Sequence, residues 1–193
     1  YLEYLYDLLD LILKKEVDTN FKIPININIE ISLKKIFSKN IKYVGIAPGA
    51  GEKNKIWPIN NFIEICKYLE SKGFILVFYI GPQEKDYQKV LEDSFKNAIF
   101  LENEKSLSNY NNIEIIMAST KFLKFAISND SGVSHMLSTN YCPLIKLFGP
   151  KDSKKFTPKL QNLITVTSSE VNSNKIDDIS VQRVKTVIEE VCL

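Results

Sequence analysis

From Ile41 onward, short runs of branched and aromatic residues alternate with longer amphipathic segments, and this alternation restricts the fold more than any other feature. The short runs predict strands at Tyr43–Ala47, Ile75–Ile80, Ala98–Leu101, Phe122–Ile127, Leu144–Phe148 and Leu163–Val166. The amphipathic segments predict helices at Ile59–Ser71, Lys85–Phe95, Ile113–Lys121, Val133–Thr139 and Val181–Val191. Because parallel strands need crossover connections, this order predicts an α/β fold with a doubly wound, Rossmann-like parallel sheet.

The first forty residues do not follow this alternation. Leu and Tyr recur at helical spacing in Tyr1–Glu16, which predicts a helix with a broad apolar face. Asp18–Glu30 alternates Ile with Asn or Pro, which is typical of an extended linker or an edge strand, and Ile31–Ser38 predicts a short helix. The chain opens at Tyr1 without a methionine, so we expect a fragment.

Charge and composition argue against several classes of protein. The net charge is only +2 and Arg183 is the only arginine, so no dedicated nucleic-acid surface is expected. Cys66, Cys142 and Cys192 lie far apart and only His135 accompanies them, which indicates neither a disulfide framework nor a zinc site. No apolar run approaches the ~18 residues of a spanning helix, and no signal peptide is visible. We expect a cytoplasmic protein with reduced thiols.

The loop after the first predicted strand has the composition of a phosphate site. Pro48–Gly51 (PGAG) is followed by Lys55 and then by the Trp57–Pro58 pair that opens a helix, and a glycine loop with a lysine before a helix suits a phosphate. It is not a Walker A loop, and Asn54 stands where a dinucleotide fingerprint has its third glycine. The alternative is a flexible turn with a solvated lysine.

Acidic residues follow two other strands. Glu84, in the GPQE loop, could accept ribose hydroxyls or could simply be an acid favoured by the helix dipole. Residues 128–137 (SNDSGVSHML) place Asp130 and His135 at a strand–helix junction, where unpaired N–H groups can bind an anion. The alternative is that Asn129 or Asp130 caps the helix while His135 packs on its inner face. A hydrolase triad is not expected, because Ser, Asp and His lie within two turns and no G-x-S-x-G motif occurs.

In their order, PGA…KIWP, GPQE, SNDSGVSH and LFGP resemble the C-terminal half of the ADP-heptose:lipopolysaccharide heptosyltransferases, a GT-B glycosyltransferase family. The resemblance runs from Tyr43 to the closing IDDISVQRVKTVIEEV. It implies that residues 41–193 bind a nucleotide sugar, with ADP-heptose as the expected donor. Residues 1–40 would then be a linker and the tail of a missing N-terminal domain. That domain would bind a lipid-linked glycan acceptor, carry the catalytic base and make any contact with the inner face of the inner membrane.

The resemblance also assigns site residues. These are Gly49, Ala50, Gly51, Lys55, Glu84, Asn111, Ile113, Asp130, Ser131, Gly132 and His135. Lys55 would contact the donor diphosphate beside the glycine loop, and Glu84 would bind the ribose. Asp130 would lie beside the donor sugar, backbone groups of the next two residues would bind phosphate, and His135 would close the site. An ungapped alignment places the adenine pocket at 111–113.

Two departures from the family pattern bear on the identity of the donor. Ile56 stands where the family often has arginine, and Gly51 where it often has serine or threonine. No D-x-D triplet occurs, so Lys55 and a helix N-terminus, without a metal ion or other cofactor, would stabilise the leaving diphosphate, and Asp130 would support the transition state. The alternative functions are a noncatalytic nucleotide-binding or regulatory Rossmann-like module and, less favoured because of the missing glycine, a Rossmann dehydrogenase.

Overall fold

A single parallel sheet forms the centre of the protein. The computed structural model describes residues 11–12, 23–81, 84–139, 142–151, 153–156 and 163–191. The strands are β1 (Lys42–Ala47), β2 (Phe74–Phe78), β3 (Ile99–Phe100), β4 (Leu123–Asn129), β5 (Leu144–Phe148) and β6 (Leu163–Thr167). Their order is β3-β2-β1-β4-β5-β6, and each neighbouring pair is parallel. The chain thus winds outward from β1 in both directions, which confirms the predicted doubly wound α/β fold.

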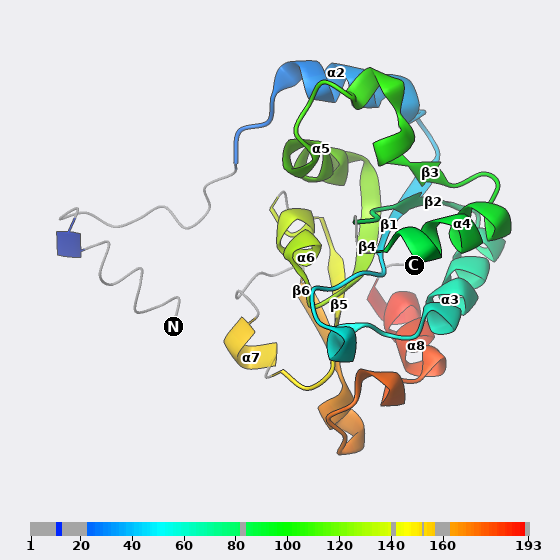
Figure 1. The fold of residues 1–193 in the computed structure, drawn as a ribbon, viewed down its shortest axis with the longest axis vertical. Helices are drawn as coiled ribbons and strands as arrows, with labels where there is room; N and C mark the ends of the chain where they lie inside the picture. The colour runs from blue at the N-terminus through cyan, green and yellow to red at the C-terminus, as the bar shows by residue number, and fades with distance from the viewer. Residues whose placement is uncertain are drawn as a thin grey trace.

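Helices cover both faces of this sheet (Figure 1). They are α2 (Ile27–Ile36), α3 (Ile59–Ser71), α4 (Lys85–Ser94), α5 (Asn112–Ser119), α6 (Gly132–Leu137), α7 (Ser153–Phe156) and α8 (Val181–Val191). Buried residues of α3, α4 and α8 share one core with one face of the sheet, whereas those of α2, α5 and α6 share a second core with the other face. Strand β1 contributes Val44 and Ile46 to the first core and Tyr43 and Ala47 to the second, as the two-residue period of a strand requires.

The segment before β1 differs from its predicted form. The expectation of a linker or edge strand through Glu30 is wrong for residues 27–30, because α2 already begins at Ile27. Asn26, one of the alternating asparagines, caps this helix by accepting a hydrogen bond from the N–H of Asn28 at 3.0 Å. The helix predicted at Tyr1–Glu16 lies largely outside the described residues.

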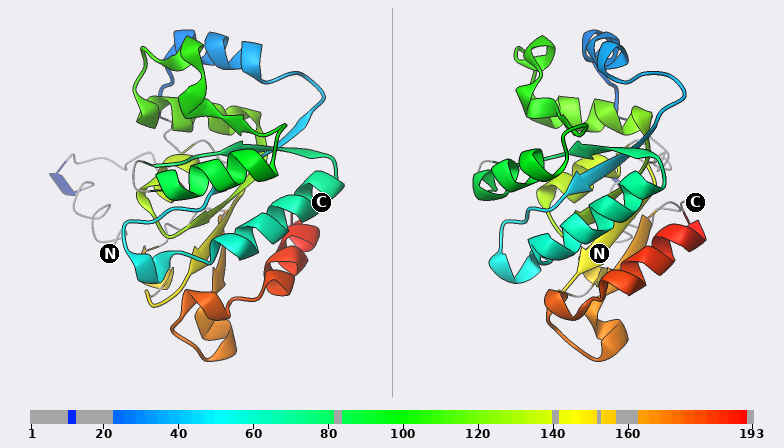
Figure 2. Two further views of the ribbon diagram at one scale, coloured as in Figure 1. Left: turned by 45° about the vertical axis from the view of Figure 1, so that its right-hand side comes forward. Right: turned by 90° about the vertical axis from the view of Figure 1, so that its right-hand side faces the viewer.

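Helix α2 packs on the same side of the sheet as α5, beside the segment that follows β3 (Figure 2). Ile29 and Leu33 are fully buried there. Phe37 stacks on Phe122 with ring centroids 4.8 Å apart, and Lys121 forms an ion pair of 2.6 Å with Glu30. Residues 27–37 therefore pack against the sheet domain, and the domain boundary at residue 40 stays a prediction.

The other predicted elements differ from the structure only at their ends, and the short helix α7 was not predicted. The helices α3 and α8 have the predicted bounds, and β5 does as well. Strand β3 is only two residues long, because Leu101 starts a 3-10 turn. Within the described residues, no helix is long and apolar enough to cross a membrane.

Candidate functional site

A buried carboxylate lies between two lysines where β4 ends. Asp130, 7% exposed, accepts a hydrogen bond at Oδ1 from Nζ of Lys146, at 2.7 Å, while Nζ of Lys55 lies 3.2 Å from Oδ2. Lys146 is in the middle of β5 and its side chain is 2% exposed. Lys55 ends the 3-10 turn Lys53–Lys55 in the loop after β1. Three segments distant in the sequence thus meet at the carboxyl edge of the sheet.

The ionisation of this cluster follows from burial and from its charges. Burial raises the pKa of Asp130, but the hydrogen bonds and charges of Lys146 and Lys55 outweigh burial, so the pKa lies below its usual value. Burial, together with the charge of Lys55, lowers the pKa of Lys146 below its usual value, although the hydrogen bond and charge of Asp130 act to raise it. Burial also acts to lower the pKa of Lys55, yet hydrogen bonds to Glu52 and Asp130 raise it overall. Lys55 therefore carries a positive charge near neutral pH.

Asn129 holds both ends of the loop that carries Lys55. Its Oδ1 accepts a hydrogen bond from the backbone N–H of Trp57 at 3.2 Å, and its Nδ2 donates to the carbonyl of Pro48 at 2.7 Å. Trp57 is fully buried, and its Nε1 donates to the carbonyl of Ile179 at 2.9 Å. These bonds tie the loop after β1 to β4 and to the segment before α8, and so place Lys55 beside Asp130.

A second carboxylate is buried under the same loop. Glu84 is 8% exposed and lies against Gly49 and Gly81, where a Cβ atom would collide with its carboxylate. The two glycines are therefore needed to admit the acid. Among the residues that the structure describes, no donor bonds the Glu84 carboxylate. Because buried acceptors are nearly always satisfied, this carboxylate is suited to accept hydrogen bonds from a ligand.

The helix after Asp130 is capped by a serine. Ser131 Oγ accepts from the N–H of Ser134 and Ser134 Oγ accepts from the N–H of Ser131, both at 3.4 Å. The alternative in which Asn129 or Asp130 caps α6 is therefore wrong, because both side chains are committed to other partners. His135 is exposed and not packed inward, so that part of the alternative is wrong as well.

His135 is electrostatically coupled to the lysine cluster. Partial desolvation of its ring and then the charge of Lys146 lower its pKa below the ordinary value, while Asp130 acts in the opposite direction. The imidazole is therefore neutral at pH 7. A neutral imidazole can donate one hydrogen bond from a ring N–H.

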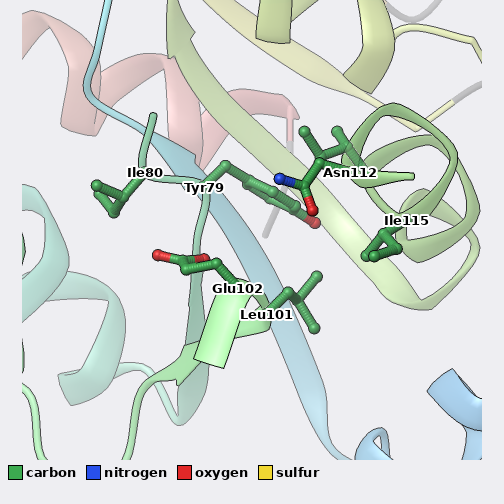
Figure 3. A pocket seen from close by; sticks show the side chains of 7 residues that line it. Tyr79, Ile80, Leu101, Glu102, Asn112 and Ile115 are labelled. Carbon is green, nitrogen blue, oxygen red and sulfur yellow. The ribbon is translucent and has the colours of Figure 1, made fainter. Parts of the chain in front are cut away.

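A pocket lies beyond the ends of β2 and β3, at the start of α5. It is lined by Tyr79, Ile80, Leu101, Glu102, Asn112, Ile115 and Ile116. Figure 3 shows the Tyr79 ring and the Asn112 amide bordering this space. Asn111 instead caps α5, its Oδ1 accepting from the N–H of Ile113 at 2.8 Å, and the Ile113 side chain is 47% exposed. The adenine-site assignment of these two residues stays a prediction.

The sequence model of glycosyltransferase family 9 (heptosyltransferase) matches residues 14–185. The chain belongs to this family. The predicted resemblance to heptosyltransferases is thereby confirmed. Lipopolysaccharide heptosyltransferase 1 from Campylobacter coli is 27% identical over 187 residues, which are 96% of this chain and 54% of the relative. The chain spans about half the length of the curated relatives it matches first.

Solved structures of heptosyltransferases share the fold. A family 9 glycosyltransferase from Veillonella parvula superposes with a TM-score of 0.77 at 18% identity, covering 91% of this chain and 54% of its own. The E. coli heptosyltransferase WaaC with ADP superposes with a TM-score of 0.67 at 21% identity, covering 84% and 48%. The same enzyme with ADP-2-deoxy-2-fluoro heptose gives a TM-score of 0.64 at 22% identity, covering 83% and 47%.

Sequence reasoning missed two residues that shape this candidate site. Asn129 was considered only as a helix cap, although it joins the loops. Lys146 was treated as one position of a buried strand. The signal was present in the strand itself: a lysine among Leu144–Phe148 needs a buried counter-charge, and acids at neighbouring strand ends are the candidates. Among the described residues, no group of three or more His, Cys, Asp or Glu could hold a metal ion.

Proposed function

We propose that this chain binds the nucleotide-sugar donor of a heptosyltransferase reaction, with ADP-heptose as the donor and a lipid-linked glycan as the acceptor. The observation that carries the proposal is that a buried carboxylate, to which no described residue donates a hydrogen bond, lies at the same sheet edge as a cationic cluster. No donor among the described residues bonds the Glu84 carboxylate. In the loop after β1, Nζ of Lys55 lies 3.2 Å from Oδ2 of Asp130. Ribose hydroxyls and a diphosphate present the complementary groups.

The charge of the cluster suits a departing diphosphate. Transfer of the sugar breaks the bond between its anomeric carbon and a phosphate oxygen, and negative charge then builds on the nucleoside diphosphate. Lys55 and Lys146 carry two positive charges against the buried negative charge of Asp130, and the other carboxylate beside Lys55, that of Glu52, is half exposed and therefore screened by solvent. The net positive charge, fixed in place before the reaction, would stabilise the leaving group without a metal ion. Backbone groups of Gly51, Ser131 and Gly132 would contact the same phosphates.

The rest of the nucleotide would extend from Glu84 toward the pocket at α5. Glu84 would accept hydrogen bonds from the ribose hydroxyls, since Gly49 and Gly81 leave room for its carboxylate and no donor among the described residues bonds it. Tyr79, Ile80 and Ile116 line the pocket and would contact the faces of the base. Asn112 would meet its polar edge.

The other half of the reaction would require residues outside this site. The chain spans about half the length of its first curated relatives. We therefore propose that the acceptor site and the catalytic base lie in a region corresponding to the half of those relatives that this chain does not cover. Lys55 and Asp130 would support the transition state from the donor side. His135, neutral at pH 7, would donate a hydrogen bond to the donor.

Calorimetric titration of the chain with ADP, UDP, GDP and ADP-heptose tests the proposal. In the presence of EDTA we expect ADP and ADP-heptose to bind with a Kd on the order of micromolar, and UDP and GDP to bind more weakly. Affinity should not change when magnesium is added. Absence of binding to all four nucleotides would refute the proposed function, and a strict magnesium requirement would refute its metal-independent form.

A further inference from the structure

Lys146 occupies a position where stability alone would favour an apolar residue. It is the third residue of β5, a strand of five buried residues, with Ile145 and Leu147 on either side. Its side chain is 2% exposed, and its ammonium lies 4.8 Å from the ring centroid of Phe148. Replacing a buried ion pair by apolar residues is often neutral or stabilising. The presence of a lysine at this buried position therefore needs an explanation other than packing.

The contacts of Asp130 supply that reason. Its two carboxylate oxygens are divided between the lysines, Oδ1 to Lys146 and Oδ2 to Lys55. Nζ of Lys55 also lies 3.2 Å from Oε1 of Glu52, whose side chain is 51% exposed. If Lys146 were neutral, the negative charge of Asp130 would cancel the positive charge of Lys55, and the pair would have no net charge to offer a ligand. With Lys146 charged, its ammonium already neutralises the negative charge of Asp130.

We propose that Lys146 is a positioning residue for the donor site, which holds and neutralises the Asp130 carboxylate so that the charge of Lys55 acts on the donor diphosphate. The inference rests on the proposed function. It concerns only the charged part of the ligand, because Lys146 is buried and reaches the ligand through Asp130 and Lys55. Adenosine, which lacks the diphosphate, should be insensitive to Lys146.

The test is a charge cycle in which ADP and adenosine affinities are measured for the wild-type chain and its variants. Lys146→Met removes the charge and leaves an unbranched side chain that is one heavy atom shorter. We expect it to weaken ADP on the order of tenfold and to leave adenosine within about twofold, as expected for loss of one charge-assisted contribution. Lys146→Met/Asp130→Asn restores the net positive charge of the cluster and should recover most of the ADP affinity.

A matched control and a second variant keep the test decisive. Lys124→Met removes an exposed lysine at the other end of β4 and should leave ADP affinity unchanged. If Lys146→Met does not fold, judged by its thermal melt, Lys146→Gln takes its place, since it keeps a donor for Asp130 without the charge. The same tenfold loss is expected.

The outcomes separate the two proposals. Failure of the wild-type chain to bind ADP refutes the proposed function, and the role of Lys146 falls with it. Wild-type ADP binding that is unchanged in the Lys146 variants refutes only the role of Lys146. Equal losses for ADP and adenosine, or no recovery in a folded double variant, would show that Lys146 is structural.

Discussion

Asn129→Ala should destabilise the protein and loosen the loop that carries Lys55. The substitution removes one acceptor and one donor, leaving the N–H of Trp57 and the carbonyl of Pro48 without their partner in a buried region. An unsatisfied buried group costs about 1 to 3 kcal/mol. Two such groups give about 2 to 6 kcal/mol, and we expect about 2 to 4 kcal/mol, since values above about 4 are exceptional for one substitution.

Urea denaturation measures this change as a lower midpoint at an unchanged m-value. For a chain of this size, about 2 to 4 °C per kcal/mol predicts a fall in Tm of about 4 to 16 °C. ADP should also bind more weakly, because the loop must be ordered on binding. Asn60→Ala, the same change at an exposed position of α3, is the control and should stay within about 0.5 kcal/mol. A loss below 1 kcal/mol in Asn129→Ala would refute the claim that Asn129 holds the loop.

Three further predictions concern the ligand. Lys55→Ala should weaken ADP by about 1 to 3 kcal/mol and adenosine much less, as calorimetry would show; equal losses would remove Lys55 from the diphosphate site. Glu84→Gln should weaken both ligands but not inorganic pyrophosphate, and an effect on pyrophosphate would argue against ribose binding. His135 should titrate by NMR below its ordinary pKa of 6.5, as the one histidine signal of the chain. Because its folded pKa is lowered, stability should rise with pH through the window between that pKa and 6.5, and ADP should raise the midpoint; a midpoint above 6.5 without ligand would contradict the account.

The central domain could be predicted from sequence because its periodicities are strong. Helix α3 follows Pro58 and precedes Gly73, which has a φ of +81°, so both of its ends are marked by residue type. Residues 25–30 (ININIE) misled because isoleucine at every second position is a strand pattern, whereas Ile29 and Leu33, four apart, form the buried face of α2. The spacing alone fits both a strand and a helix. The helix is selected because Ile29 and Leu33 pack in the same core as α5, and this contact is not visible in the sequence.

Several residues that meet at this edge of the sheet could be named from sequence, but their contacts could not. Lys55 and Asp130 were both identified, yet their ion pair depends on β1 and β4 being neighbours, which the order of strands along the chain does not state. The same holds for Lys146, which meets Asp130 only because β5 lies next to β4. Glu84 was identified, while its burial under Gly49 depends on the pairing of β1 with β2.

The most direct test of the central claim is an ADP titration of the isotopically labelled chain followed by backbone amide NMR. The account predicts that the largest shifts fall on Ala50, Gly51, Lys55, Ser131 and Gly132, which follow β1 and β4. Amides at the opposite end of the sheet, such as those that precede β2, should be unaffected. Saturable shifts confined to that opposite end, or no saturable shifts at millimolar ADP, would contradict a donor site at the carboxyl edge of the sheet.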